Sequence, residues 1–231
     1  MKRLIKKLLI EIFNGFGFRL NFGKKVNLPI LKYDEDQMFK EVFNKIKPFT
    51  VIDEQKAFIL YQMTKHSLKF EGDIAEVGVY KGGTAKLFAS LLEGSDKKLY
   101  LFDTFEGMPA VRKDLDTHNK GDFHDTSLEK VKENVGKYEN VLYYKGFFPQ
   151  TATPIKDKMF CLVHIDVDIY QSVKDCCDFF YNRIEKNGVM VFDDYGFPSC
   201  PGAKKAVDDY FQNKPEYLFY LPTGQAVIIK N

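Results

Sequence analysis

Cysteine is scarce in this sequence. The 231 residues contain four, Cys161, Cys176, Cys177 and Cys200, and no two of them have the Cys-x-x-Cys spacing. Without that spacing, and with no recognisable secretory leader before them, they argue against both a zinc framework and a disulfide framework. The sequence therefore predicts a protein of the reducing cytoplasm. Cys200, which follows the last acidic motif, is either a reactive thiol or a buried bystander, and the second is the more common case.

No uncharged apolar run is long enough to span a bilayer. The opening stretch MKRLIKKLLIEIF places leucine, isoleucine and phenylalanine at helical spacing against lysine and arginine, which predicts a basic amphipathic helix over residues 1–13. Two interpretations stay open. The helix either contacts the inner face of a membrane as a peripheral anchor or packs on its own domain or on a second copy in a homo-oligomer. We predict an amphipathic arm over 1–32 and a folded domain over 33–231.

Acidic residues are nearly missing from that arm. Residues 1–32 hold eight Lys or Arg against the single acid Glu11, whereas the rest of the chain holds 26 basic and 31 acidic residues. A nucleic-acid-binding protein normally carries its positive charge on the folded domain, and here that domain is acidic. We therefore predict no nucleic-acid partner.

From Gly72 onward, short apolar runs alternate with longer amphipathic stretches. Strands are expected at 74–80, 98–105, 141–146, 161–168 and 188–195, with helices near 83–93, 127–138 and 171–186 between them. Nearly continuous apolar strands that alternate with helices are typical of a parallel sheet covered on both faces.

Further elements flank this pattern. Two helices are expected before it, about 35–46 and 54–70, the second capped by Asp53, and a third near 202–213 after it. The last two apolar runs, YLFYLP and QAVIIK, are joined by Thr223-Gly224, a turn so short that the strands must be antiparallel. The prediction is an α/β fold with a mainly parallel sheet, helices on both faces and an antiparallel C-terminal hairpin.

The stretch EVGVYKGGT joins the first strand to the following helix. Glu76 stands near the strand end, Gly78, Gly82 and Gly83 lie in the turn, and the helix starts near Thr84. Glycines allow close backbone approach, and a helix N-terminus favours an anionic group. The spacing is neither that of a dinucleotide fingerprint nor that of a P-loop. A glycine turn needed only for packing is the alternative.

Asp103 ends the second strand, about one βα unit later. An acid at this place can accept hydrogen bonds from both ribose hydroxyls of a nucleoside. Together with the glycine turn it indicates a nucleoside that carries an amino-acid-like anion. That description fits S-adenosylmethionine better than a dinucleotide.

Four carboxylates end two later strands. Asp166 and Asp168 follow the fourth strand, and Asp193 and Asp194 follow the fifth. Two carboxylates about 4 Å apart repel by about 4 kcal/mol at an effective dielectric of 20, so such a cluster needs protons or a cation. All-oxygen ligands suit Mg²⁺, which keeps positions open for substrate. Loop caps or ion-pair partners are the alternative roles.

Several stretches carry a family resemblance from about Asp53 to the C-terminus. They are IAEVGVYKGGTA, LYLFDTFEGMP, GDF, HIDVDIYQS and MVFDDYGFPSCPGAKKAVDDYF. The chain resembles the macrocin O-methyltransferase (TylF-type) family, metal-dependent sugar O-methyltransferases with the class I, Rossmann-like methyltransferase fold and a seven-stranded sheet. The stretch HIDVD differs from the arginine-containing strand more usual in that family, and this departure bears on the acceptor.

The resemblance implies a role for each matching residue. Asp166, Asp193 and Asp194 would bind Mg²⁺, and Asp168 would be the general base. The cofactor S-adenosylmethionine would be held by residues of the glycine turn, the second strand end and the following loop: Glu76, Gly78, Tyr80, Gly82, Thr84, Asp103, Thr104, Phe123 and Ser127. The loop 121–123 would lie over it, and a small-molecule or glycan sugar would be the acceptor.

Other residues keep two interpretations. His118 and His124 lie in the long loop after the second strand, where either could contact substrate or replace Asp168 as base, although solvated loop histidines are more common. His164 is expected to be a hydrogen-bonded core residue. The pair Phe147-Phe148 either flanks the adenine or belongs to the core.

Two competing functions stay open. Asp166-Val167-Asp168 also has the form of the Asp-x-Asp metal site of a glycosyltransferase that uses a nucleotide sugar. A membrane-associated accessory subunit with an inactive core is the other alternative. Neither the acceptor nor the oligomeric state follows from motifs at strand ends.

Overall fold

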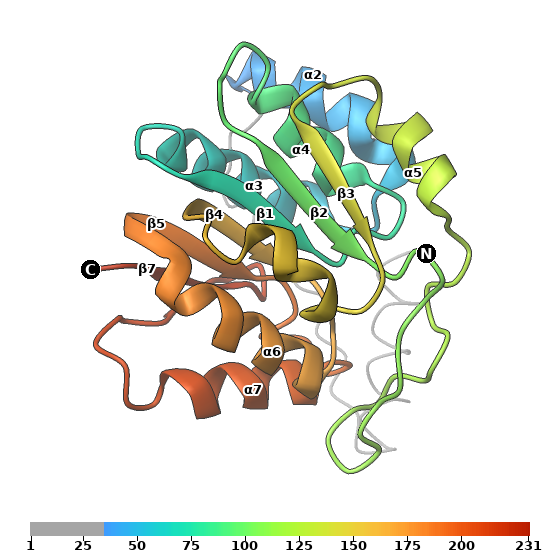
Figure 1. Ribbon diagram of the computed structural model, residues 1–231, viewed down its shortest axis with the longest axis vertical. Helices are drawn as coiled ribbons and strands as arrows, with labels where there is room; N and C mark the ends of the chain where they lie inside the picture. Colours follow the sequence, from blue (N-terminus) through green and yellow to red (C-terminus); the bar gives the residue numbers. More distant parts are fainter. Residues whose placement is uncertain (1–34) are drawn as a thin grey trace, which may run out of the picture. The chain divides into compact units, whose positions relative to one another are not determined.

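The described part of the chain is built around a seven-stranded sheet in the spatial order β3-β2-β1-β4-β5-β7-β6 (Figure 1). The computed structural model describes residues 35–231, and the predicted arm and its amphipathic helix lie outside them. The strands are β1 (Asp73–Val77), β2 (Leu99–Asp103), β3 (Val141–Lys145), β4 (Phe160–Ile165), β5 (Ile184–Phe192), β6 (Phe219–Tyr220) and β7 (Ala226–Ile229). All neighbours pair in parallel except β7, which runs antiparallel to β5 and to β6. This confirms the predicted sheet and its C-terminal hairpin.

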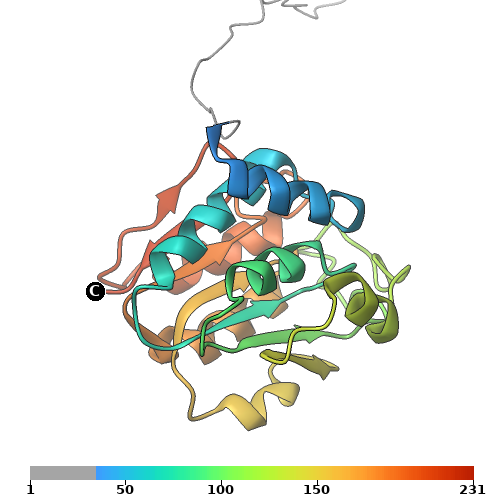
Figure 2. The same cartoon turned by 90° about the horizontal axis from the view of Figure 1, so that it is seen from above.

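Helices cover both faces of the sheet (Figures 1 and 2). One layer contains α2 (Gln37–Ile46), α3 (Glu54–Ser67), α4 (Gly83–Leu91) and α5 (Leu128–Val135); the other contains α6 (Tyr170–Phe180) and α7 (Pro201–Phe211). The described residues also contain the short 3₁₀ turns η2 (Lys47–Phe49), η3 (Gln150–Ile155) and η4 (Tyr181–Arg183). Residues 36–231 form one compact unit.

Alternation along the strands assigns side chains to the two layers. Ala75 and Val77 of β1 and Val163 and Ile165 of β4 join the apolar core on the side of α6 and α7. Residues between them point to the opposite face because successive side chains of a strand alternate. His164 accordingly lies against α4, with its ring 5.7 Å from that of Phe88. The sheet is therefore buried on both faces, as its apolar strands predict.

Helix ends agree with the sequence signals at one place and differ at another. Asp53 caps α3 as predicted, since its carboxylate accepts a hydrogen bond of 2.9 Å from the Lys56 amide. The predicted helix over 171–186 is wrong at its end, because β5 already begins at Ile184. Arg183 closes the helix by donating to the Phe179 carbonyl at 2.6 Å, and Ile184 then pairs with β4.

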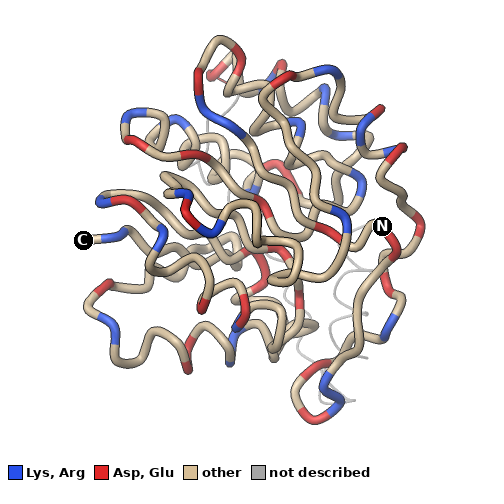
Figure 3. Tube along the Cα trace, in the orientation of Figure 1, with Lys and Arg blue, Asp and Glu red and all other residues tan. Residues whose placement is uncertain are grey.

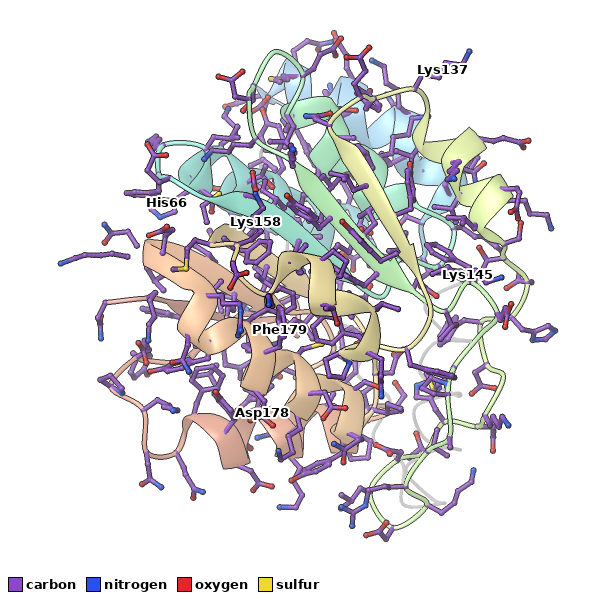
Figure 4. The ribbon with its side chains drawn as sticks, viewed as in Figure 1. His66, Lys137, Lys145, Lys158, Asp178 and Phe179 are labelled. Carbon is purple, nitrogen blue, oxygen red and sulfur yellow. The ribbon has the colours of Figure 1, made fainter. Side chains whose placement is uncertain are left out.

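Side chains on α6 illustrate the division between surface and core (Figure 4). Asp178 is half-exposed and pairs with Lys174 one turn earlier. Phe179 instead packs against Phe148, with ring centroids 5.3 Å apart. Phe148 also stacks on Phe180, so this half of the predicted aromatic pair packs against the core and, like Phe147, borders the cavity at the strand ends.

Basic and acidic residues are interspersed along the helices of the described domain (Figure 3). No helix within residues 35–231 has the length and apolarity that a membrane crossing requires. The membrane contact predicted for residues 1–13 stays a prediction, because those residues lie outside the described part.

The order in which strands are added to the sheet reverses between β1 and β4. From β1 it proceeds to β2 and β3 on one side, and it then crosses over to β4 on the other side. Ligands of open α/β sheets bind beyond the carboxyl ends of the strands at such a switch point. Gly78, Asp103, the pair Asp166 and Asp168, and the pair Asp193 and Asp194 lie at the carboxyl ends of β1, β2, β4 and β5, so the topology brings them to one edge.

Candidate active site

A cavity of about 400 Å³ opens at this edge of the sheet. A volume of this size suits a drug-sized or cofactor-sized ligand. Nine predicted site residues line it: Gly78, Tyr80, Asp103, Thr104, Phe123, Asp166, Asp168, Asp193 and Asp194. His118, Phe147 and Cys200 line it as well. The structure therefore brings together the glycine turn, the second strand end and all four carboxylates.

Asp166, Asp193 and Asp194 form the centre of the acidic cluster. Each offers an oxygen, and the three oxygens lie within 4.8 Å of one another. β4 and β5 are adjacent and parallel, and the Asp193 amide donates to the Ile165 carbonyl at 3.0 Å, which places both strand ends side by side. Burial and then the neighbouring carboxylates raise the pKa of Asp166 and of Asp194 well above the ordinary value. Ionisation of all three carboxylates is therefore unfavourable unless a cation balances their charge.

Lys56 enters this cluster from α3, and the sequence analysis missed it. Its ammonium forms an ion pair with the Asp193 carboxylate, donates to the Asp193 carbonyl at 3.1 Å and lies 3.9 Å from the ring centroid of Phe197. Burial opposes its charge, but Asp193 and the other carboxylates raise the pKa of Lys56. Among the described residues that line the cavity, it is the one Lys or Arg.

The carboxylate of Asp193 is held from three sides. Besides Lys56, Gln225 donates to it at 2.8 Å, and Nε2 of His164 lies 3.6 Å from its Oδ1. Burial would raise the pKa of Asp193, but the His164 and Lys56 contacts lower it. Nδ1 of His164 lies 3.0 Å from Oε1 of Glu76, which confirms the predicted hydrogen-bonded core histidine. Burial disfavours the charged ring, but its two acidic neighbours raise the pKa of His164 to about 9.

Asp168 stands beside the cluster in a different environment. Its backbone has φ = 58°, a left-handed conformation that is uncommon for aspartate, and its amide donates to Asp194 at 3.2 Å. The Cys200 thiol donates to its Oδ1 at 3.4 Å, and Nε2 of His118 lies 3.7 Å from the same oxygen. Burial raises the pKa of Asp168. Backbone strain of this kind occurs where the surrounding structure fixes a functional geometry.

Asp103 fixes the shape of the glycine turn. One carboxylate oxygen accepts from the amides of Val79 and Tyr80 at 2.7 and 2.9 Å, and the other accepts from the Phe105 amide at 2.7 Å. A carboxylate offers about four acceptor positions, so a ribose hydroxyl would find few of them free. Asp103 lines the cavity where the ribose is predicted, and its role toward a ribose stays a prediction.

The loop after β2 folds back over the turn. The rings of Tyr80 and Phe123 meet edge to face at 5.3 Å, and both residues have positive φ angles. The Tyr80 hydroxyl donates to Asp125 at 2.7 Å, while Thr126 donates to the Tyr80 carbonyl at 2.5 Å. Thr104 donates to the Gly107 carbonyl at 2.6 Å. These contacts hold the Tyr80 and Phe123 rings at the cavity, and the place of the 121–123 loop over the cofactor stays a prediction.

Four residues predicted to contact the cofactor do not line the cavity: Glu76, Gly82, Thr84 and Ser127. Glu76 alternates with the cavity-lining Val77 and is fully buried on the α4 face. Gly82 and Ser127 are the N-caps of α4 and α5, and Thr84 is buried in the first turn of α4. In this geometry they support the turn and the loop. His124 also lies outside the lining and contacts the Gly121 carbonyl at 2.8 Å.

Gly78 carries a prediction of its own. Its φ is +87°, and a Cβ at this position would lie 1.8 Å from the Asp166 carbonyl oxygen. Gly94 has a similar φ of +79° but no atom within 4 Å of the same point, so it is a matched control. We expect Gly78→Ala to lower the free energy of unfolding by about 1–3 kcal/mol more than Gly94→Ala, the range for overpacking. Urea denaturation of both variants measures the difference, and equal losses would mean that the close approach to Asp166 is relaxed easily.

The cluster fits a hard divalent cation. Its donors are carboxylate oxygens, the ligand type that Mg²⁺ prefers, and they lie within 4.8 Å of one another. Asp193 already pairs with Lys56 through Oδ2 and accepts from Gln225 through Oδ1, which also faces His164, so its remaining lone pair for a cation is on Oδ2. Burial and the neighbouring carboxylates raise the pKa values of Asp166 and Asp194, so a cation bound between them would favour their ionised forms.

Similar solved structures support the fold. The O-methyltransferase NovP superposes with a TM-score of 0.71 at 24% identity, over 79% of this chain and 82% of that one. The calicheamicin methyltransferase CalS11 superposes with a TM-score of 0.66 at 18% identity, over 91% of this chain and 99% of that one.

A family model shows the family, and the chain is also similar to curated O-methyltransferases. The chain is 29% identical over 153 residues to a demethyldecarbamoylnovobiocin O-methyltransferase of Streptomyces niveus, covering 60% of this chain and 58% of that protein. It is 26% identical over 155 residues to a mycinamicin III 3''-O-methyltransferase of Micromonospora griseorubida, covering 60% of each. The matches thus span about three fifths of these relatives. The model of the macrocin-O-methyltransferase (TylF) family matches residues 50–216, so the chain belongs to that family.

Proposed function

We propose that this protein transfers a methyl group from S-adenosylmethionine to a sugar hydroxyl with the help of Mg²⁺. The observation that carries the proposal is the cavity that joins the Gly78–Tyr80 turn and Asp103 to the four carboxylates. The turn suits a nucleoside with an amino-acid tail, and the carboxylates suit a divalent cation. A methyl donor and a site that activates a hydroxyl would then share one chamber.

The charge balance of the cavity favours a cation. Asp166, Asp168, Asp193 and Asp194 face it, while Lys56 is the one Lys or Arg that lines it among the described residues. Two carboxylates about 4 Å apart repel by about 4 kcal/mol at an effective dielectric of 20, so a divalent ion would relieve a substantial penalty. We assign Asp166, Asp193 and Asp194 as its ligands. When bound, Mg²⁺ would lower the pKa of the acceptor hydroxyl.

Asp168 is the proposed general base. It lines the cavity beside the cluster and is not one of the three predicted Mg²⁺ ligands. Burial raises its pKa, which brings the carboxylate closer to the value at which proton transfer is efficient. The acceptor hydroxyl passes its proton to Asp168 as its oxygen forms a bond to the methyl carbon and the carbon–sulfur bond of S-adenosylmethionine breaks. The products are the methyl ether and S-adenosylhomocysteine, and Asp168 returns the proton to solvent.

The proposed acceptor class rests on the relatives. All three names describe O-methyltransferases, and the name of a relative from Streptomyces olivaceus, 27% identical over 153 residues, describes a substrate that carries a rhamnosyl group. For this chain, a surface glycan or a glycosylated metabolite fits the same chemistry. The cytoplasm, with its supply of S-adenosylmethionine, is the proposed compartment.

Calorimetric titration of S-adenosylhomocysteine in the presence of Mg²⁺ tests the nucleoside site. We expect one-site binding that Asp103→Ala weakens by at least about tenfold, because hydrogen bonds to charged groups contribute about 1.5–3 kcal/mol. Glu106→Ala is the matched control, since this exposed acid pairs with Lys145 and does not line the cavity. Equal affinities in the two variants would contradict the assignment of Asp103. Binding of a nucleoside diphosphate sugar by the folded protein, without binding of S-adenosylhomocysteine, would favour a glycosyltransferase.

A further inference from the structure

Three side chains of different chemistry meet at the wall of the cavity. His118 comes from the loop after β2, Asp168 from the loop after β4, and Cys200 from the residue that precedes α7. Sγ of Cys200 lies 3.6 Å from Nε2 of His118 and 3.4 Å from Oδ1 of Asp168. The His118 and Asp168 atoms are 3.7 Å apart. The three donors thus form a nearly equilateral triangle.

This triangle has the size of one face of a zinc tetrahedron. Zinc binds sulfur at about 2.3 Å, imidazole nitrogen at about 2.0–2.1 Å and carboxylate oxygen at about 2.0–2.2 Å, so its donors lie roughly 3.5 Å apart. All three observed separations are within a few tenths of an ångström of that value. The donors need only small movements to share an ion. The absence of a Cys-x-x-Cys spacing does not exclude such a site, because its ligands come from three separate loops.

A second contact prepares His118 for metal binding. Its Nδ1 lies 3.2 Å from Oδ2 of Asp122, while its Nε2 faces Cys200 and Asp168. A carboxylate behind a histidine is the usual second partner of a zinc ligand, because it fixes the ring orientation and raises the basicity of the other nitrogen. The same carboxylate accepts from the Asn119 amide at 2.9 Å, so Asp122 is itself held in place.

We propose that His118, Asp168 and Cys200 form a second metal site, selective for Zn²⁺ and distinct from the carboxylate cluster proposed for Mg²⁺. Thiolate and imidazole ligands favour zinc, whereas carboxylates favour magnesium, so the two sites differ in kind. Zinc replaces the thiol proton of Cys200, which passes to solvent. All three ligands line the cavity, so the fourth position of the ion opens toward it.

Occupation of this site would control the enzyme. Asp168 cannot accept a proton from the acceptor while its carboxylate binds zinc, so zinc would inhibit methyl transfer. This consequence rests on the proposed function, in which Asp168 is the base. The binding of zinc itself rests only on the three donors and Asp122, and it can be tested without any methyl acceptor.

The test uses Cd²⁺ as a spectroscopic substitute for zinc, with Mg²⁺ in excess to occupy carboxylate sites. A bound thiolate gives a sulfur-to-cadmium charge-transfer absorbance in the ultraviolet. We expect this absorbance to saturate at one ion per chain and to disappear when excess Zn²⁺ is added. Cys200→Ser should abolish it, and His118→Ala should weaken cadmium binding by at least about tenfold.

Cys176→Ser is the matched control. This thiol also lines the cavity, but it belongs to no group of three metal-binding side chains among the described residues. The control should therefore keep the full absorbance. Circular dichroism and melting curves establish that each variant is folded. Absorbance that survives Cys200→Ser, or its complete absence from folded wild-type protein at millimolar Cd²⁺, would overturn the proposal. Titration of S-adenosylhomocysteine on the same samples reports separately on the proposed function.

Discussion

Replacing Asp166 with asparagine should abolish Mg²⁺-dependent methyl transfer and at the same time stabilise the metal-free protein. Loss of one group that stabilises charge in an active site lowers kcat by about 10²–10³, and we expect at least the upper value for a metal ligand. Stability should change in the opposite direction, because asparagine removes one of four crowded carboxylates without changing the volume. We expect the melting temperature without Mg²⁺ to rise by about 2–4 °C, which corresponds to roughly 1 kcal/mol for a chain of this size.

Paired melting curves with and without Mg²⁺ separate the two effects. Wild-type protein should be stabilised by Mg²⁺, and Asp166→Asn should lose this response. Asp178→Asn is the matched control, since this half-exposed acid on α6 pairs with Lys174 and does not line the cavity. It should change neither turnover nor the Mg²⁺ response. Full turnover of Asp166→Asn with metal chelated would refute the assigned mechanism. A lower melting temperature would instead mean that the carboxylate is stabilised by its surroundings.

The acidic motifs could be predicted because local sequence determines them. Each stands directly after an apolar run, and the carboxyl ends of parallel strands meet at one edge of a sheet. The prediction of Asp166 and Asp193 required no knowledge of distant contacts beyond this rule. The same reasoning failed to bring Glu76 into the cavity, because the position lies one residue before the end of β1 and alternation turns it toward α4.

Residues that meet across long sequence separations could not be predicted. Lys56 is 137 positions from Asp193, and His118 is 82 positions from Cys200. A partial signal for Lys56 exists, because it shares the buried side of α3 with Ala57, Leu60 and Tyr61, where a lysine needs a partner. No comparable pattern marks Gln225, whose contact with Asp193 depends on the pairing of β7 with β5. Such partners follow from topology and packing.

Of the substitutions described, Lys56→Met should lower the free energy of unfolding most. The ammonium is buried and paired with Asp193, and removal of one partner from a buried ion pair costs about 3–5 kcal/mol because the other charge stays uncompensated. Methionine retains the length of the apolar stem, so most of the loss reports the charge. Urea denaturation without Mg²⁺ measures it. Lys65→Met is the matched control in the same helix: its ammonium is half-exposed, and we expect a change of about 1 kcal/mol or less.

A double variant decides between charge and packing. If the loss in Lys56→Met comes from the unpaired Asp193, then Lys56→Met combined with Asp193→Asn should recover most of it. If it comes from the contact between the lysine and the Phe197 ring, the double variant should be as unstable as the single one.

The response to Mg²⁺ tests the role of Lys56 in a second way. A cluster that has lost its ammonium should bind the cation more tightly, so Mg²⁺ should raise the melting temperature of Lys56→Met more than that of wild-type protein. Lys56 would then be the group that limits the negative charge of the site and so tunes its affinity for metal.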